Sequence, residues 1–149
     1  MVQAISSHTP DIFAMRCKEH AEIVFRHLCA NAKCRFWMIY KNYDKQIFTE
    51  RFVKILSDKI GRDVDLRIIF TEDSDENIPS DVRARIKIIP NACNKMAPSI
   101  ILVDNEYLCS EMDSDAPEYI VCYFNSNDNE IKKVVPSIED NFDGIWNNI

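Results

Sequence analysis

Four carboxylates in the second half of the sequence have a spacing that suits divalent metal chemistry. Asp104 and Glu106 lie in a predicted turn between two strands, and Glu111 and Asp113 follow the second strand. Carboxylates that converge from strand ends can hold the metal ion of a phosphoryl-transfer site. The same residues also fit a turn and a solvated loop, which is the interpretation that we favour.

Nucleophilic catalysis needs a base beside its nucleophile, and histidine is the usual base near neutral pH. The chain has three histidines, His8, His20 and His27. The first lies near the chain start, and the other two are seven residues apart on a predicted helix. We expect packed or surface side chains here rather than catalysts.

A second group of charged residues could contact phosphate. Arg83, Arg85 and Lys87 alternate along the sequence, which would place all three on one side of a strand. Arg62 and Arg67 could add to such a strip. The other interpretation is that these are edge charges that discourage aggregation.

The cysteines are even in number but do not indicate disulfides. There are six of them, at Cys17, Cys29, Cys34, Cys93, Cys109 and Cys122. We expect reduced thiols, because four lie in apolar stretches and the N-terminus lacks a signal peptide. Zinc is the alternative, with Cys17 and His20 three residues apart and His27, Cys29 and Cys34 downstream. Because no C-x-x-C pair exists, we expect neither a metal nor a cofactor.

Glycine is scarce, and this scarcity excludes several enzyme classes. Gly61 and Gly144 are the only two in 149 residues. A phosphate loop, a dinucleotide fingerprint and a nucleophile elbow each need closely spaced glycines, so none can be written here. We expect Gly61 to end a helix in the left-handed conformation and Gly144 to permit close packing or a bend beside Trp146.

The charge balance bears on partners and location. The formal net charge is −6, which argues against general attraction to nucleic acid or anionic lipid, although a local basic face could still exist. No apolar run approaches the roughly 18 to 20 residues that span a bilayer. We therefore expect a cytoplasmic protein that does not contact membranes, with nucleic acid less favoured as a partner than protein.

Periodicity then indicates the elements that position these residues. Apolar residues at intervals of three and four predict helices, and short apolar runs predict strands. The helices run from Thr9–Asp11 to Asn31, over 48–61, and over the last residues, where Pro136 should break or kink the chain. The strands span 34–40, 64–70, 86–89, 99–103, 107–109 and 119–124, with a loop over 71–80. The first two strands and the helix between them predict a parallel β–α–β unit. One domain over 1–149 follows, with the order of residues 1–8 left open.

This order of elements resembles a phospholipase D-like domain from about Asp11 onward. The segments that carry the resemblance are Pro98-Ser99-Ile100-Ile101-Leu102-Val103-Asp104-Asn105-Glu106-Tyr107 and Phe142-Asp143-Gly144-Ile145-Trp146. The resemblance implies a layered α/β domain in which helices flank a mixed β-sheet.

Active members of that family carry H-x-K-x-x-x-x-D, in which the histidine attacks phosphorus and the lysine holds the phosphate oxygens. The resemblance places Ala97 at the histidine, Ser99 at the lysine and Asp104 at the aspartate. Alanine cannot act as a nucleophile, and serine cannot supply a fixed positive charge. The Gly-Ser pair that follows the motif is replaced by Glu111-Met112. Asp104 then begins a turn, in which its carboxylate can accept nearby backbone N–H groups.

The sequence therefore predicts a non-catalytic phospholipase D-like module with a binding or regulatory role. It is most similar to small degenerate members from bacteria and their mobile elements, including phage. Asp104, Ser99 and Glu106 would form the remnant site. Active relatives with one motif per chain pair two chains around a shared site, so the resemblance implies a homodimer, and we expect a protein partner.

Two alternatives stay open. One is a metal-dependent nuclease or phosphodiesterase that uses the acidic cluster from Asp104 to Asp113. The other is an acidic antagonist of a nucleic-acid-binding protein, in which the loops Glu72–Glu76 and Glu111–Asp115 imitate nucleic-acid charge.

Overall fold

The computed structural model of this chain describes residues 12–15, 18–72, 77–90, 99–113, 118–123 and 133–148. Four helices and seven strands lie within these ranges. They are β1 (Ile12–Met15), α2 (Lys18–Ala30), β2 (Arg35–Tyr40), α3 (Glu50–Gly61), β3 (Asp65–Phe70), α4 (Ser80–Arg83), β4 (Ile86–Ile88), β5 (Ile100–Val103), β6 (Tyr107–Asp113), β7 (Glu118–Tyr123) and α5 (Val135–Asn147). None of these helices is long and apolar enough to cross a bilayer.

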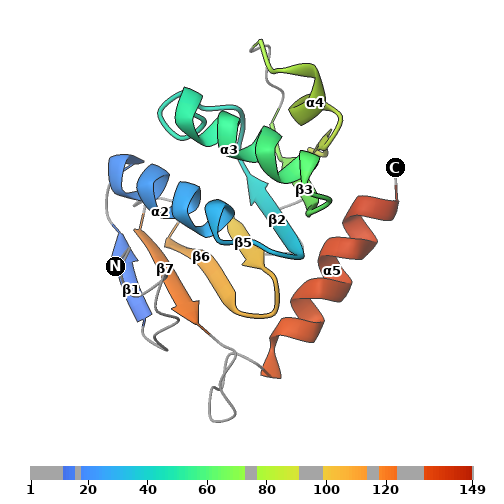
Figure 1. The fold of residues 1–149 in the computed structure, drawn as a ribbon. Helices are drawn as coiled ribbons and strands as arrows, with labels where there is room; N and C mark the ends of the chain where they lie inside the picture. Colours follow the sequence, from blue (N-terminus) through green and yellow to red (C-terminus); the bar gives the residue numbers. More distant parts are fainter. Residues whose placement is uncertain are drawn as a thin grey trace.

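The strands form one mixed sheet in the order β1-β7-β6-β5-β2-β3-β4 (Figure 1). β2, β3 and β4 are parallel, whereas β5, β6, β7 and β1 are joined by antiparallel pairing. This confirms the predicted α/β class with a mixed sheet. It also brings β5, from the second half of the chain, beside β2.

The predicted β–α–β unit is confirmed. β2 and β3 are apolar runs that pair in register from Arg35 with Asp65 to Tyr40 with Phe70. The helix between them, α3, begins after Thr49, whose hydroxyl accepts the N–H of Phe52 at 3.2 Å. Such a cap satisfies one of the four N–H groups that the first turn of a helix leaves without a partner.

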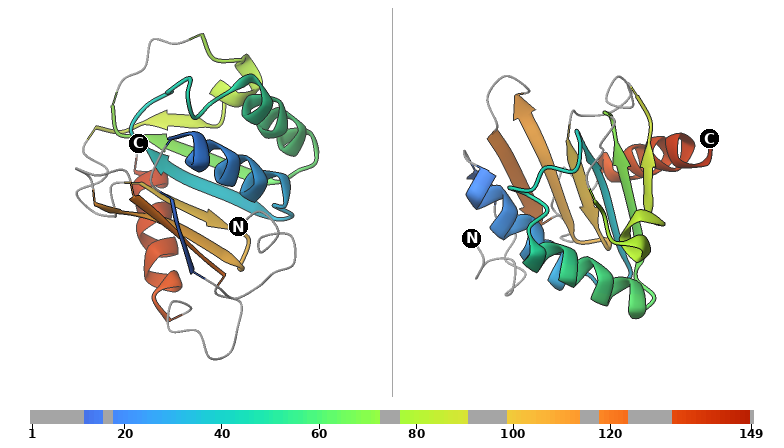
Figure 2. Two further views of the ribbon diagram at one scale, coloured as in Figure 1. Left: turned by 90° about the vertical axis from the view of Figure 1, so that its left-hand side faces the viewer. Right: turned by 90° about the horizontal axis from the view of Figure 1, so that it is seen from above.

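The sheet is covered on both faces (Figure 2). α2 and α3 lie on one face and α5 lies on the other. Alternation along the strands sends Phe36 and Phe70 toward α2 and α3 and sends Trp37 toward α5. The ring of Trp37 stacks on Phe142 of α5, with 4.9 Å between ring centroids. The result is a three-layer arrangement with an apolar core on each side of the sheet.

The predicted start of the first helix is wrong. Ile12–Met15 forms β1, which pairs antiparallel with β7, and α2 begins only at Lys18. The buried stripe of α2 contains Ala21, Val24 and Leu28, whereas Phe13, which the predicted helix would include, lies in β1. The helical spacing of Phe13 is outweighed by sheet pairing, which satisfies the backbone of a short apolar run. Residues 9–11, where this helix was predicted to begin, lie outside the described residues.

Gly61 ends α3 as predicted, but the predicted left-handed conformation of Gly61 and the predicted close packing at Gly144 are wrong. Gly61 is the last residue of α3 and its φ is not positive; Asp63 adopts the left-handed conformation instead, with φ 60°. Aspartate tolerates this region better than most residues, so the turn after α3 does not need glycine. Gly144 does not serve close packing, because a Cβ atom added there would meet nothing within 4 Å.

Two further boundaries differ from the prediction. Pro136 is the second residue of α5 and thus lies in its first turn, where the missing N–H of proline costs nothing, so it does not break the helix. Part of the predicted loop over 71–80 is also ordered, because Ser80 begins the short helix α4. β4, β5, β6 and β7 confirm the other predicted strands, and β6 extends to Asp113.

Candidate functional site

Asp104 follows β5 directly and has a left-handed backbone, with φ 51°. Its carboxylate accepts three backbone N–H groups, those of Lys33 at 3.0 Å, Cys34 at 2.7 Å and Arg35 at 2.9 Å. The sequence predicted a turn-forming aspartate that binds nearby N–H groups. The structural role is supported, but the donors come from the segment that enters β2, about 70 positions earlier.

Arg35 closes the same turn from its other side. Its Nε donates to the backbone oxygen of Asp104 at 2.7 Å, and its Nη2 donates to Asn105 Oδ1 at 3.1 Å. Nη1 lies 3.1 Å from the carboxylate of Glu139 in α5. One guanidinium therefore joins β2, the β5–β6 turn and α5. No sequence motif marked Arg35 as part of the site, because its partners are distant along the chain.

Ser99 lies at the other end of β5 from Asp104, five residues away, or about 16 Å along an extended strand. It is 3% exposed, and within the described part of the chain its Oγ has no hydrogen-bond partner. Because this hydroxyl is buried, it is not exposed to a ligand at the surface. Ala97 lies outside the described residues.

The backbone places the four residues predicted as a metal cluster far apart along β6 and the turn before it. Glu106 is half-buried in the turn with Asp104. Glu111 and Asp113 lie in the far half of β6, because β6 leaves the turn at Tyr107. Six residues of strand separate Tyr107 from Asp113, which is about 20 Å. No group of three metal-binding side chains occurs in the residues that the structure describes.

The predicted alternation of Arg83, Arg85 and Lys87 along one strand is wrong, whereas their contact with phosphate stays a prediction. Arg83 is the last residue of α4, Arg85 lies in the following turn and Lys87 lies in β4. The alternating spacing suggested that residues 83–87 form one strand, but the chain makes a helical turn first, in which Val82 packs into the core below α3. Lys87 contacts α5: its Nζ donates to the backbone oxygen of Trp146 at 2.7 Å and lies 4.4 Å from the indole centroid.

Sequence reasoning missed a cluster of cations and indoles between the sheet and α5. The guanidinium of Arg67 lies 4.7 Å from the ring of Trp37 and 5.6 Å from that of Trp146. It also forms ion pairs with Asp65 at 3.0 Å and Asp143 at 2.7 Å. These carboxylates balance its charge, so the cluster fastens α5 to the sheet. The sequence did contain one signal of this cluster, since Arg35 and Trp37 are two residues apart in β2 and therefore lie on the same face of the sheet.

Among the residues that the structure describes, the histidines and cysteines form no cluster that could hold a metal. His20 and His27 lie on α2, and Cys17 is outside the described residues. Cys29 is fully buried, and burial raises the pKa of its thiol to about 12. Burial also raises the pKa of the Cys109 thiol. Cys34 is exposed. The two buried thiols thus act as small apolar side chains.

The acidic loops are only partly described. Glu72 accepts a hydrogen bond from the Asn42 amide at 3.2 Å. Residues 73–76 and the side chains over 111–115 lie outside the described residues, so their prediction as mimics of nucleic-acid charge is untested.

Comparison with known proteins finds solved structures with a similar fold, but no match to a protein-family model or to a curated protein. No protein-family model matches the sequence, and no curated protein matches it. Solved structures do match. Nuc from Salmonella typhimurium, a phospholipase D family member, is 16% identical with a TM-score of 0.58, over 92% of this chain and 94% of that chain.

Two further structures are similar. NucT from Helicobacter pylori is 7% identical with a TM-score of 0.57, over 91% of this chain and 94% of that chain. TrmBL2, an archaeal chromatin protein with a novel mode of DNA binding, is 11% identical with a TM-score of 0.61, over 93% of this chain and 52% of that chain. Identities this low concern the fold alone, and they support a phospholipase D-like fold for this chain.

Proposed function

We propose that this chain is a non-catalytic binding or regulatory module built on a phospholipase D-like fold. The observation that carries the proposal is the state of Asp104. Its carboxylate is engaged by three backbone N–H groups, so it acts as a structural anchor and has little capacity left for a substrate. The aspartate position of the resembled motif is therefore kept for the architecture.

The other two motif positions agree with this proposal. Ala97 replaces the nucleophile, and no histidine occurs after His27. Ser99 replaces the lysine and is buried, so it provides neither charge nor access to a phosphate. Oxyanion stabilisation and a nucleophile supply most of the rate enhancement in such chemistry, and neither Ala97 nor Ser99 can supply them at the motif positions.

The module would act through association with other proteins, and the chain would form a homodimer. The homodimer is proposed from the resemblance alone, in which active relatives with one motif per chain pair two chains around a shared site. Sedimentation equilibrium over a range of concentrations would test it. A monomer at all concentrations would contradict the homodimer.

Hydrolysis assays test the absence of catalysis. The purified chain would be incubated with a chromogenic phosphodiester, with single-stranded DNA and with phosphatidylcholine vesicles, each with magnesium, manganese or zinc. We expect no turnover above that of buffer. Turnover that is abolished in Glu106→Gln, with the thermal melt unchanged, would overturn the proposal.

The metal-dependent alternative is less well supported, because the predicted ligands lie at opposite ends of β6. It still makes a distinct prediction. A metal that binds only the folded chain would raise the melting temperature, and Glu106→Gln would remove the rise. No change with magnesium, manganese and zinc would count against a metal site.

A further inference from the structure

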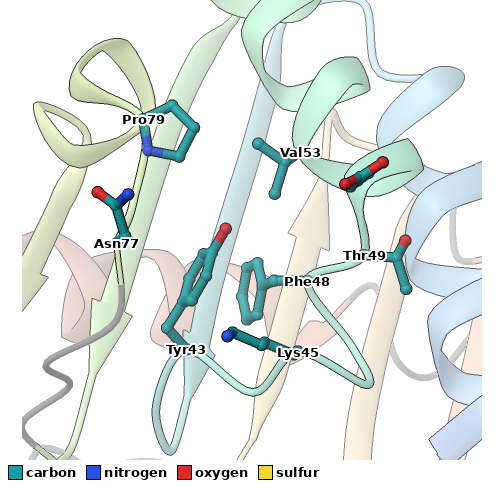
Figure 3. Close-up of a pocket in the computed structure, with 8 residues that line it drawn as sticks. Tyr43, Lys45, Phe48, Thr49, Val53, Asn77 and Pro79 are labelled. Carbon is teal, nitrogen blue, oxygen red and sulfur yellow. The ribbon is translucent and has the colours of Figure 1, made fainter.

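A pocket with a volume of about 420 Å³ opens on the α3 side of the sheet, at the carboxyl ends of β2 and β3 (Figure 3). Its walls come from the β2–α3 connection, the first turns of α3 and the segment before α4. The lining residues are Tyr43, Lys45, Phe48, Thr49, Glu50, Val53, Asn77 and Pro79. This volume is in the range of small-molecule sites, and strand carboxyl ends are where α/β sheets commonly bind ligands.

The base of the pocket is aromatic and fixed. The rings of Tyr43 and Phe48 stack with 5.0 Å between centroids and an interplanar angle of 21°. Phe48 is 3% exposed and also stacks on Phe52 at 5.4 Å. Its ring meets Tyr40 and Phe70 edge-on. A ligand would therefore meet a rigid apolar surface that does not rearrange on binding.

The connection that carries these rings is held by Asp44. Its backbone oxygen accepts the N–H groups of Ile47 at 3.0 Å and Phe48 at 2.7 Å. Its carboxylate accepts the N–H of Gln46 at 2.9 Å and pairs with Lys18 of α2 at 2.7 Å. Because the loop is already ordered, binding would cost little conformational entropy.

Opposite charges lie on the two sides of Phe48 along the chain. Lys45 is exposed and lies beside the rings of Tyr43 and Phe48 (Figure 3). Glu50 is exposed at the first position of α3 and forms no ion pair with any described residue. Thr49 is not available to a ligand, because its hydroxyl donates to Glu22 at 2.8 Å and accepts from Phe52.

We propose that this pocket binds a small zwitterion with an apolar body, of the class of α-amino acids with an aromatic or branched side chain. Lys45 would pair with the carboxylate and Glu50 with the ammonium group. The apolar body would lie against Phe48, Val53 and Pro79. The inference goes beyond the proposed function, since the pocket shares no residue with the Asp104 turn and does not depend on whether the chain hydrolyses anything.

Isothermal titration with L-phenylalanine tests the proposal, with two analogues that each lack one charge. L-Phenylalaninamide has no carboxylate and N-acetyl-L-phenylalanine has no ammonium group, whereas glycine has both charges and no apolar body. We expect saturable binding of L-phenylalanine and binding of each other probe that is weaker by about tenfold or more, as for the loss of one charge-assisted contact.

Variants identify the site. Lys45→Gln and Glu50→Gln should each weaken binding of L-phenylalanine by about tenfold. Lys54→Gln on α3 and Glu19→Gln on α2 make the same charge changes at exposed positions outside the pocket and should leave binding unchanged. Val53→Trp should abolish binding by filling the pocket, and circular dichroism should show that this variant still folds.

Three results would overturn the proposal. The first is an absence of saturable L-phenylalanine binding by the folded chain. The second is equal binding of L-phenylalanine and either single-charge analogue, which would exclude the zwitterion class. The third is binding that Lys45→Gln, Glu50→Gln and Val53→Trp all leave unchanged, which would place the ligand elsewhere.

Discussion

At the amino end of β2, charged and polar groups surround a buried carboxylate; beyond its carboxyl end, two exposed charged side chains line a pocket with an aromatic base. Asp104 accepts three N–H groups, and Arg35 bonds the turn around it. Lys45 and Glu50 stand at the opposite end of the strand beside Phe48. A position in a catalytic motif thus does not show whether a charge is available to a ligand. Availability depends on what the backbone around the charge already donates.

The largest effect that bears on this comparison should come from Asp104→Asn. The amide retains one acceptor oxygen but places an NH₂ group against backbone donors. We expect the free energy of unfolding to fall by about 3 kcal/mol, because partly buried N–H groups lose a charged acceptor. Urea denaturation measures this, with Glu106→Gln as a control in the same turn. An unchanged urea midpoint would show that the Asp104 carboxylate is dispensable to the fold.

A smaller effect is expected at the pocket end of β2. Thr49→Val removes the cap of α3 and one partner of the buried carboxylate of Glu22, so it should cost about 2 kcal/mol of stability. Glu50→Gln, the next residue, should change stability by about 0.5 kcal/mol or less. Thermal melts of the two variants provide the measurement. Equal losses would show that Glu50 is structural, which would remove the contrast between the ends of β2.

The ion pair between Lys18 and Asp44 should add less than about 1 kcal/mol to the free energy of unfolding, in a pH-dependent way, because both groups are partly solvated. Burial alone would raise the pKa of Asp44, but the hydrogen bonds from Lys18 and from the N–H of Gln46, with the charge of Lys18, hold it below its ordinary 3.8. The hydrogen bond with Asp44 raises the pKa of Lys18 above 10.5, against a smaller opposing effect of burial.

The signs of these shifts define the pH window. Because folding lowers the pKa of Asp44, this carboxylate stabilises the fold above the pKa of the unfolded state, and its contribution is lost as the pH falls through the folded-state pKa. Because folding raises the pKa of Lys18, its ammonium group stabilises the fold below pH 10.5, and its contribution is lost at higher pH. Lys18→Gln should therefore be less stable than the native chain at neutral pH, and the difference should vanish in acid below the Asp44 pKa. A difference that persists there would contradict the assignment. Urea midpoints at both pH values decide it.

The smallest perturbation is chemical labelling of thiols under native conditions. Cys34 is exposed next to the Asp104 turn, whereas Cys29 and Cys109 are buried with raised pKa values. Cys34→Ala should remove one fast-reacting thiol per chain, because the thiolate is the reactive form and an exposed cysteine forms it more readily than a buried one. Cys29→Ala should leave the fast phase unchanged. Loss of a fast equivalent in Cys29→Ala instead would show that the core near α2 opens readily.

The sequence predicted those elements whose signals are local. The runs that form β2 and β3, and the helical spacing between them, sufficed for the parallel unit. Ile12–Met15 was assigned wrongly, since its partner β7 lies more than 100 residues later and only pairing distinguishes it from a helix. Arg83 and Arg85 were placed on one strand because nothing local shows that Val82 must reach the core.

The candidate site was predictable only in part. The motif alignment singled out Asp104 and indicated a structural role, but its donors became neighbours only through the pairing of β5 with β2. The pocket gave no local signal at all. Phe48 and Thr49 belong to one connection, whereas Asn77 and Pro79 come from another, and only the packing of α3 and α4 joins them.

The cluster that fastens α5 contains both tryptophans of the chain, Trp37 and Trp146. All intrinsic tryptophan emission therefore originates from one face of the sheet. The fluorescence of the unlabelled chain reports the attachment of α5, while events in the pocket on the opposite face should leave the indole spectrum nearly constant. The molecule thus carries an optical reporter that separates release of its last helix from occupation of its pocket.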